Sequence, residues 1–385
     1  MDATHSAVIA LMKSAVTGIA EPLPEGFDLE QIEELVSKQA IDTLVYAGAV
    51  KCGIPKNLPV MQRLFQKYIQ LMFRSEGQMA EVKKLFKAFD ENGIDYLPLK
   101  GVLMKELYPA HELRYMGDAD ILIKTTQEKK IRDIMLTLGY SWVDESDHEL
   151  VWKSPGLYVE FHKRLIPSYN IDFYSYFGDG WSLAKTSGGT QFAMSPENNF
   201  IFEFVHMAKH YRDGGVGARF ILDLWMLQRA YPKMDKEYIL NEFKKLKLDV
   251  FYKNVGLLIS SWFESGEATE VTEFMTQRFF SGDSWGNAED FLLRKNFNTQ
   301  AKQTGSFSFI MHKLFPGLEE MSWHYRALKK FPWLLPFFWP VRLVHIALFR
   351  RDKIRKTTAS LNTTTDDKLK AYMSALKYVG LEYDF

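Results

Sequence analysis

The sequence is poor in cysteine and has no excess charge of either sign. Its 385 residues include one cysteine, Cys52, which excludes a disulfide framework and a zinc site built from several cysteines. Lysine plus arginine number 48, and so do aspartate plus glutamate, so the formal net charge is zero. This balance argues against broad electrostatic binding to nucleic acid, although a local basic groove is compatible with it. The single cysteine fits a reducing compartment, and we expect a cytoplasmic protein.

The chain also has no recognisable export signal and no uninterrupted apolar run. Its start, MDATHSAVIALMKSAV, contains no basic segment followed by a long apolar one, so we predict no signal peptide. The most apolar stretch, 331–356, is interrupted by prolines and contains Arg342 and His345. A membrane-spanning helix needs about 20 uninterrupted apolar residues, so we predict no transmembrane segment. We expect a buried helix here, with a helix at a membrane surface as the alternative.

A short segment of alternating patterns lies between two helical regions. Apolar residues spaced three and four apart predict helices over most of 1–92, and Gly93 is typical of a helix end. From 94 to 165 the pattern becomes strand, helix, strand, helix and two further strands. A Gly- and Ser-rich segment, 178–190, is expected to be a loop, and helical patterning resumes at Ser195, a good N-cap.

These patterns predict an α+β fold in three parts. A small mixed-sheet α/β core at 93–190 is flanked by an N-terminal helical region, 1–92, and a C-terminal helical domain, 191–385. Much of the high aromatic content lies in the C-terminal half, which suggests packed helices there. We find no internal repeat and no low-complexity tract.

Two aspartates open the predicted strand DADILI (118–123). Side chains alternate along a strand, so Asp118 and Asp120 project from the same face. Glu160, in YVEFH (158–162), is a third carboxylate on a strand that could lie beside 118–123. Three converging acids repel one another unless a cation lies among them, and an oxygen-only ligand set suits Mg²⁺ or Mn²⁺. The sequence therefore predicts a metal site at these acids, where two ions could clamp a phosphoryl group and activate a hydroxyl.

A lysine and a glycine, Lys100-Gly101, stand where a predicted strand gives way to a short helix. A glycine there lets a triphosphate approach the backbone, and the N-terminus of the following helix offers amide donors. Lys100 and Arg114 are then candidate charge partners for the phosphates.

This order of features resembles the nucleotidyltransferase superfamily, to which DNA polymerase beta and the aminoglycoside nucleotidyltransferases belong. More closely, LPLKG, LYP, RYMGDADILI and VEFH look like the uncharacterised bacterial nucleotidyltransferase-like family. That family carries a Lys-Gly turn, an Arg before a Gly-Asp-x-Asp strand, and an acid-x-His strand. The sequence departs from the superfamily at Val102, where Gly or Ser is usual, and at Glu160, where Asp is commoner.

The resemblance implies a nucleotidyltransferase core at 93–190 and assigns roles to the residues that carry it. The metal-ligand and catalytic roles fall on Asp118, Asp120 and Glu160. The roles on the phosphate side, binding the nucleotide, fall on Lys100, Gly101 and Arg114.

A second polar cluster lies in HMAKHYRDGGVGARFILDLWML. His206 and His210 are four residues apart, hence on one helix face, and Lys209 lies beside them. One interpretation is a zinc pair, but no further His or Cys stands near and the His-Glu-x-x-His pattern is missing. A second is two structural histidines in a helical interface. We favour a third, supported by a similar helix in the related family, in which His206, Lys209 and His210 contact the nucleotide, while Arg219 and Asp223 brace the site or bind the acceptor.

Together these features predict an enzyme that uses Mg²⁺ and a nucleoside triphosphate (NTP). A hydroxyl or phosphate oxygen of an acceptor would attack the α-phosphorus, and pyrophosphate would leave. His162 would orient Glu160, act as a base, or make a structural hydrogen bond. A small-molecule acceptor is favoured, with an RNA end or a protein hydroxyl as alternatives, and the base of the NTP stays open. The alternative function is a non-catalytic nucleotide-binding or regulatory module on the same fold.

Overall fold

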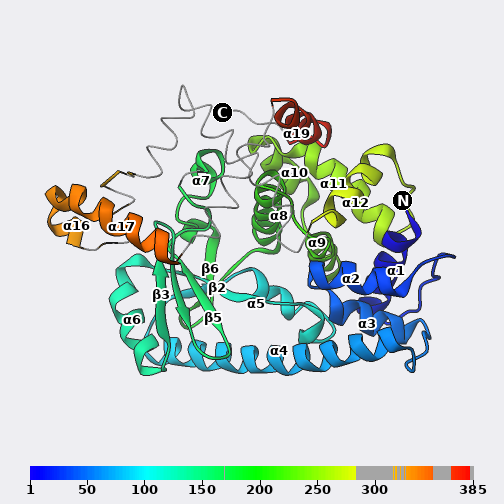
Figure 1. Ribbon diagram of the computed structural model, residues 1–385, viewed down its shortest axis with the longest axis horizontal. Coiled ribbons are helices and arrows are strands. Elements are labelled where there is room, and N and C mark those ends of the chain that lie inside the picture. The colour runs from blue at the N-terminus through cyan, green and yellow to red at the C-terminus, as the bar shows by residue number, and fades with distance from the viewer. Residues whose placement is uncertain are drawn as a thin grey trace.

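A computed structural model shows that the chain has an α+β fold, with helices on several sides of a mixed sheet (Figure 1). It describes residues 1–168, 170–282, 327–349 and 366–381, with the single positions 315, 317, 318, 321 and 325. In Figure 1 the sheet stands to the left, one long helix runs along the bottom, and a group of helices fills the right and the top.

In the described part of the chain, seven strands form one mixed sheet. Their bounds are β1 Tyr96–Pro98, β2 Asp118–Ile123, β3 Ser141–Glu145, β4 Glu149–Lys153, β5 Tyr158–His162, β6 Ala184–Gly188 and β7 Gln191–Met194. The strand order is β3-β4-β5-β2-β1-β7-β6. The central strand β2 runs antiparallel to β1 and parallel to β5, so β2 and β5 present corresponding residues at the same edge.

The observed sheet confirms the predicted central strands and shows that one predicted loop is partly wrong. The pattern DADILI is strand β2, and the predicted strand pair after residue 148 is the antiparallel hairpin β4–β5. The loop expected at 178–190 is partly wrong, because β6 and β7 form an antiparallel hairpin and β7 pairs with β1. The β6 sequence, AKTSG, is mostly exposed at the sheet edge, so it carries no alternating apolar signal.

Four helices precede the sheet. They are α1 Ala3–Thr17, α2 Leu29–Gln39, α3 Asp42–Lys51 and α4 Pro59–Glu91. The 33-residue α4 contributes Val60 and Leu64 to the core shared with α1–α3, and Leu85 and Phe89 to the core under the sheet. It ends just before Gly93, whose φ of 63° is the left-handed conformation of a helix terminus. One helix therefore connects the N-terminal helices to the sheet, as the bottom of Figure 1 shows.

The helices after β7 pack mainly through aromatic side chains. Helix α8 begins where Ser195 accepts a hydrogen bond from the backbone N–H of Asn198, as its N-cap sequence predicts. Phe204 of this helix contacts the rings of Phe243 and Phe251 at 4.5 and 5.6 Å between centroids. The bounds are α8 Pro196–Arg212, α9 Arg219–Ala230, α10 Lys236–Lys245, α11 Asp249–Phe263, α12 Glu270–Phe280 and α19 Asp366–Tyr378, while shorter helices α5 Lys100–Lys105, α6 Glu128–Thr137 and α7 Ile171–Phe177 accompany the strands.

The aromatic stretch near the C-terminus contains α16 (Ala327–Lys330) and α17 (Leu335–Phe349), which project from the left of the molecule in Figure 1. The expectation of a buried helix is wrong for its described side chains, because Trp333, Phe337 and Val341 are 69%, 67% and 52% exposed. An apolar sequence alone therefore does not determine whether these side chains are covered. Residues 350–356 lie outside the described residues. Within the described chain, no helix has the length and apolar character needed to cross a membrane.

Candidate active site

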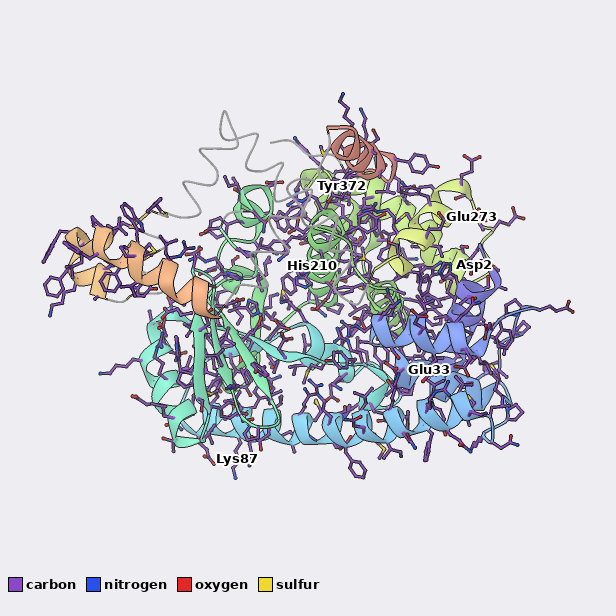
Figure 2. All side chains as sticks on the ribbon, viewed as in Figure 1. Asp2, Glu33, Lys87, His210, Glu273 and Tyr372 are labelled. Atoms are coloured by element: carbon purple, nitrogen blue, oxygen red, sulfur yellow. The ribbon has the colours of Figure 1, made fainter. Side chains whose placement is uncertain are left out.

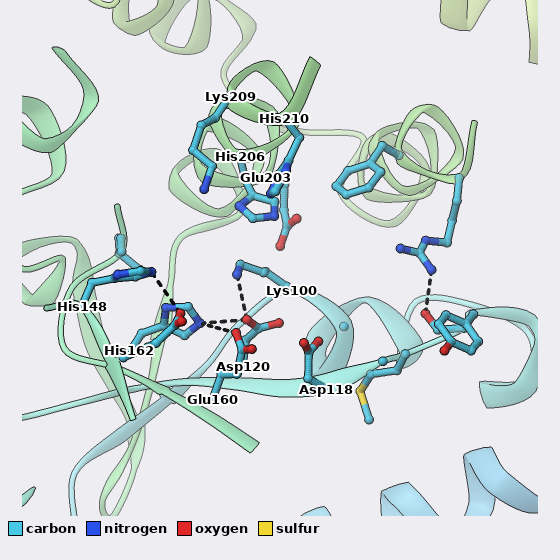
Figure 3. Close-up of a pocket in the computed structure, with 18 of the residues that line it drawn as sticks. Lys100, Asp118, Asp120, His148, Glu160, His162, Glu203, His206, Lys209 and His210 are labelled. Atoms are coloured by element: carbon cyan, nitrogen blue, oxygen red, sulfur yellow. Dashed lines mark hydrogen bonds and ion pairs between the residues drawn. The ribbon is translucent and has the colours of Figure 1, made fainter. Parts of the chain in front are cut away.

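A cavity of about 230 Å³ lies between the sheet and the helices α8 and α9. Figure 3 shows carboxylates from β2 and β5 on one side and polar side chains from α8 on the other, pointing toward one another. In Figure 2, His210 of α8 lies near the centre of the molecule in that view. The cavity brings together all nine residues predicted for the site: Lys100, Gly101, Arg114, Asp118, Asp120, Glu160, His206, Lys209 and His210.

The three predicted carboxylates share one face of the sheet. In the parallel pairing of β2 with β5, Asp120 lies directly opposite Glu160, and Asp118 lies opposite Tyr158. Because side chains two residues apart on a strand project to the same side, Asp118 and Asp120 point into the same space as Glu160. The convergence therefore follows from the register of two neighbouring strands.

Asp120 is the buried centre of this group. Its Oδ1 accepts a hydrogen bond from Lys100 Nζ at 2.7 Å and lies 2.8 Å from His162 Nε2. Burial alone would raise the pKa of Asp120, but the charges and hydrogen bonds of Lys100 and His162 outweigh it and hold the pKa well below its usual range. Asp120 is therefore ionised at neutral pH.

The other two carboxyls, Asp118 and Glu160, both have a raised pKa, because their surroundings disfavour the ionised forms. Burial, and then repulsion from Asp120, raises the pKa of Asp118 to about 6. Burial, and then repulsion from Asp118, raises the pKa of Glu160 to about 8. A divalent cation would remove this repulsion, so the charge balance fits a metal site.

The donor atoms fit such a cation as well. One ligand atom each from Asp120, Glu160 and His162 lies within 4.8 Å of the others. Carboxylate oxygens suit Mg²⁺ and Mn²⁺, and an added imidazole is compatible with Mn²⁺. Asp118 is not part of this tight group and projects from the same strand face. His162, which sequence reasoning gave an orienting, basic or structural role, thus stands beside the predicted ligands.

The Lys100-Gly101 turn is tightly packed. Lys100 has a φ of 43°, a left-handed backbone conformation that residues other than glycine seldom adopt. A Cβ on Gly101 would lie 2.9 Å from Met116 Cγ and 3.2 Å from Arg114 Nη1, too close for an ordinary contact. Glycine is therefore required here by packing, and backbone contact with a triphosphate stays a prediction.

Arg114 is bound within the protein. Its Nη2 donates to Asp223 Oδ2 at 2.9 Å, and its Nε donates to Asp223 Oδ1 at 3.3 Å. Tyr108 donates to the same carboxylate at 2.7 Å. Arg114 thus fastens the segment before β2 to α9. These contacts support the prediction that Asp223 braces the site. A phosphate contact of Arg114 stays a prediction.

The helix side of the cavity carries the two histidines. The rings of His206 and His210 meet edge to face at 4.4 Å between centroids, and His206 stacks on Phe220 at 6.1 Å. Burial, followed by the nearby charge of Lys100, lowers the pKa of His206 well below its usual value, so its ring is neutral. Among the described residues, no third ligand joins this pair in a group able to hold an ion. This arrangement favours a helix that faces the carboxylates over a zinc pair.

Sequence reasoning missed Glu203, which lines the cavity one turn before His206. Its side chain is buried, and its Oε1 has no hydrogen-bond partner in the described chain. Burial, followed by repulsion from Asp223, raises the pKa of Glu203 to about 8. In Figure 3 its carboxyl points from α8 toward Lys100. The available signal was its spacing of three from His206, but FIFEFV looks like an apolar core segment. His148 and Glu149 also line the cavity and were missed.

Comparison with known families identifies the class. A family model described as an uncharacterised nucleotidyltransferase matches residues 25–264, more than half of the chain. The chain therefore belongs to this uncharacterised nucleotidyltransferase family, which confirms the resemblance seen in the sequence. The matched segment includes the sheet and all the cavity residues. Comparisons with curated proteins and with solved structures find no match. The family supports nucleotidyl transfer as the general activity and names no substrate.

Proposed function

We propose that the protein is an Mg²⁺-dependent (or Mn²⁺-dependent) nucleotidyltransferase that moves a nucleoside monophosphate from an NTP to an acceptor hydroxyl or phosphate. The observation that carries this proposal is the convergence of Asp118, Asp120 and Glu160 on one face, where burial and mutual repulsion raise the pKa of Asp118 and of Glu160. A helix with His206, Lys209 and His210 lies across the cavity from them. Metal ligands and groups for a triphosphate thus face the same space.

The protein groups divide into those that hold the metal and those that hold the nucleotide. Asp118, Asp120 and Glu160 would hold the cation, which when bound neutralises the triphosphate and acts as a Lewis acid at the transferred phosphoryl group. Lys100 and Lys209 would offset phosphate charge, and the neutral ring of His206 beside Phe220 offers a flat surface for the base. Catalysis would then rest mainly on positioning and electrostatic stabilisation.

The chemical step is a substitution at the α-phosphorus. The acceptor oxygen forms a bond to the α-phosphorus, the bond from that phosphorus to the bridging oxygen breaks, and pyrophosphate leaves with the bonding electrons. The acceptor proton passes to a carboxylate, for which Glu160 is the candidate. We favour a small-molecule acceptor. An RNA end or a protein hydroxyl are the other acceptors that activity measurements would distinguish.

The test is a thermal-shift panel of ATP, CTP, GTP and UTP, each with and without Mg²⁺. It compares the wild type, Asp120→Asn, and the control Asp133→Asn, which changes an exposed aspartate on α6. We expect one NTP at about 100 times its Kd to raise the Tm of the wild type and the control by about 2–5 °C only with Mg²⁺. Asp120→Asn should lose this shift. An equal shift in Asp120→Asn, or no shift with any NTP, would contradict the proposed site.

One observation favours a second candidate, a nucleotide-binding or regulatory module without turnover. Lys100 Nζ lies 2.7 Å from Asp120 Oδ1, so a protein cation already occupies part of the space beside the central carboxylate. If this ion pair persists when nucleotide binds, the acids cannot hold two metal ions. Such a module would bind an NTP and release no pyrophosphate, whereas the enzyme releases it.

A further inference from the structure

Arg219, the first residue of α9, is a buried cation in the wall of the cavity. The residue is 6% exposed to solvent. Nη1 donates to the carbonyl of Tyr115 at 3.1 Å, while Nε has no hydrogen-bond partner in the described chain. Burial, followed by repulsion from Arg114, lowers the pKa of Arg219 to about 10, yet the guanidinium stays charged at neutral pH. The fold thus holds a cation that lacks a full set of partners.

The carboxylate that raises the pKa of Arg219, Asp223, is already occupied by other donors. Asp223 accepts two hydrogen bonds from Arg114 and one from Tyr108. Between the described residues, no ion pair within 4.0 Å joins Asp223 to Arg219. Arg114 is thus paired, while Arg219, in the same neighbourhood, is not. A buried, unpaired cation is costly unless an anion arrives to complete it.

Glu203 is a second unsatisfied group in the same cavity. The residue is 4% exposed, and its Oε1 has no hydrogen-bond partner among the residues that the structure describes. Glu203 and Arg219 line one cavity, and no ion pair joins them in the described chain. Buried polar groups are nearly always satisfied by the protein, by water or by a ligand. Two unsatisfied groups that line one cavity therefore indicate a ligand that touches both.

We propose that Arg219 binds an anionic group, a phosphomonoester or a carboxylate, on the acceptor, and that Glu203 hydrogen-bonds a hydroxyl of the same molecule. The acceptor class is therefore a small polyol or hydroxy compound that carries an anion. Calling the ligand an acceptor rests on the proposed function. Anion binding by Arg219 does not, because it is argued from the contacts of Arg219 alone. The N-terminal end of α9, beside Arg219, adds a favourable field for the anion.

The charges around each cation separate this subsite from the triphosphate. Lys100 interacts with Asp120, Glu160 and Asp118, where a metal-bound triphosphate would lie. Arg219 interacts instead with Arg114, Asp223 and two tyrosines. Charges from both sets of residues affect the pKa of Glu203. They are those of Asp223 and Arg114 on one side and of Lys100 and Asp120 on the other. On this basis we assign an anion at Arg219 to the second substrate, and competition with an NTP tests the assignment.

The experiment measures binding of inorganic phosphate and of glycerol 3-phosphate by calorimetry, without Mg²⁺. It compares the wild type with Arg219→Met, Arg219→Lys and the control Arg229→Met, which changes an exposed arginine on the same helix. We expect Arg219→Met to weaken phosphate binding by about tenfold or more, because it removes the charge and the hydrogen bonds of the guanidinium, and Arg219→Lys to weaken it less, because it keeps the charge. Arg229→Met should bind like the wild type. Equal binding by Arg219→Met, or no binding by the wild type, would overturn the subsite.

Two further arms identify the source of the anion and the role of Glu203. Phosphate should still bind when Mg²⁺ and a saturating NTP are present. If the NTP instead displaces phosphate, Arg219 binds the γ-phosphate and the acceptor subsite is overturned. Glycerol 3-phosphate should bind the wild type more tightly than phosphate does, and Glu203→Ala should remove that difference. An unchanged difference in Glu203→Ala would overturn its role. Phosphate binding that depends on Arg219 in a protein that binds no NTP would reject the proposed enzyme while keeping the anion site.

Discussion

Lys105 is a buried lysine whose ammonium group is satisfied by the protein itself. It donates to Ser75 Oγ at 2.6 Å and to the carbonyl of His111 at 2.8 Å. Burial, followed by repulsion from Arg114, lowers the pKa of Lys105 from 10.5 to about 7. Below pH 7 both the folded and the unfolded chain carry the proton. Between pH 7 and 10.5 the folded protein has lost a proton that the unfolded chain retains, so the free energy of unfolding rises with pH.

Replacing Lys105 by Met should remove this pH dependence. We expect the wild type to gain stability relative to Lys105→Met as pH rises from 7 to 9, by up to about 1.4 kcal/mol per pH unit. Urea unfolding at pH 6, 7, 8 and 9 measures the difference. Lys83→Met, at an exposed lysine of α4, is the matched control and should run parallel to the wild type. Parallel curves for Lys105→Met as well would contradict the lowered pKa.

Gly101 should be intolerant of even one methyl group. A Cβ there would approach Met116 Cγ to 2.9 Å, so Gly101→Ala should cost about 1–3 kcal/mol in the free energy of unfolding. Gly77 offers a matched comparison, because it lies in α4 with no atom within 4 Å of an added Cβ. Gly77→Ala should stabilise the protein by about 0.5–1 kcal/mol. Denaturant unfolding of both variants checks the pair, and equal effects would count against the packing explanation.

Individual residues show where sequence reasoning succeeds and where it ends. Asp118 and Asp120 were predictable because strand alternation places them on one face, and Glu160 because a second strand carries an acid. The Lys100–Asp120 ion pair and the position of Glu203 were not, since they depend on how α5 and α8 pack against the sheet. Local pattern determines which face a side chain takes, while tertiary packing determines its neighbour.

Among the secondary-structure elements, α9 is fastened to the sheet through one buried ion pair. Arg114, just before β2, donates twice to Asp223 of α9. Asp223→Asn should destabilise the protein by about 3–5 kcal/mol, because it leaves the buried guanidinium without a countercharge. Adding Arg114→Met to Asp223→Leu should cost less than the sum of the two single changes. Additive effects in urea unfolding would show that the two side chains do not interact.

Strands and helices differed in how well their patterns predicted them. Strand β2 begins with alternating polar and apolar residues and ends in an apolar run, while β4 and β5 are short, mostly apolar segments bounded by polar residues or turns, and all three were found. The hairpin β6–β7 was missed because its strands are short and one is exposed at the edge of the sheet. Helix α17 was expected to be buried because it is apolar, but composition does not say what packs against it.

The site exists only because separate regions of the chain meet. Strands β2 and β5 supply the acids, the first residue of α5 is Lys100, and helices α8 and α9 close the cavity with Glu203 and Arg219. The helix α4, which joins the core under the sheet to the N-terminal helices, fixes one side of this arrangement. Carboxylates of the sheet thus face Lys209 of α8 and Arg219 of α9 across one cavity, which is the arrangement that the proposed transfer would use.

Pyrophosphate release is the measurement that decides between the enzyme and the non-catalytic module. It would use the NTP that stabilises the protein, Mg²⁺, and a pool of small polyol phosphates as acceptors. We predict Mg²⁺-dependent release by the wild type and by Asp133→Asn, and release at least about 100-fold slower by Asp118→Asn and Asp120→Asn, given the usual size of electrostatic contributions to catalysis. Equal release by the Asn variants would contradict the carboxylate site, and binding of the NTP with no pyrophosphate would assign the protein to the non-catalytic class.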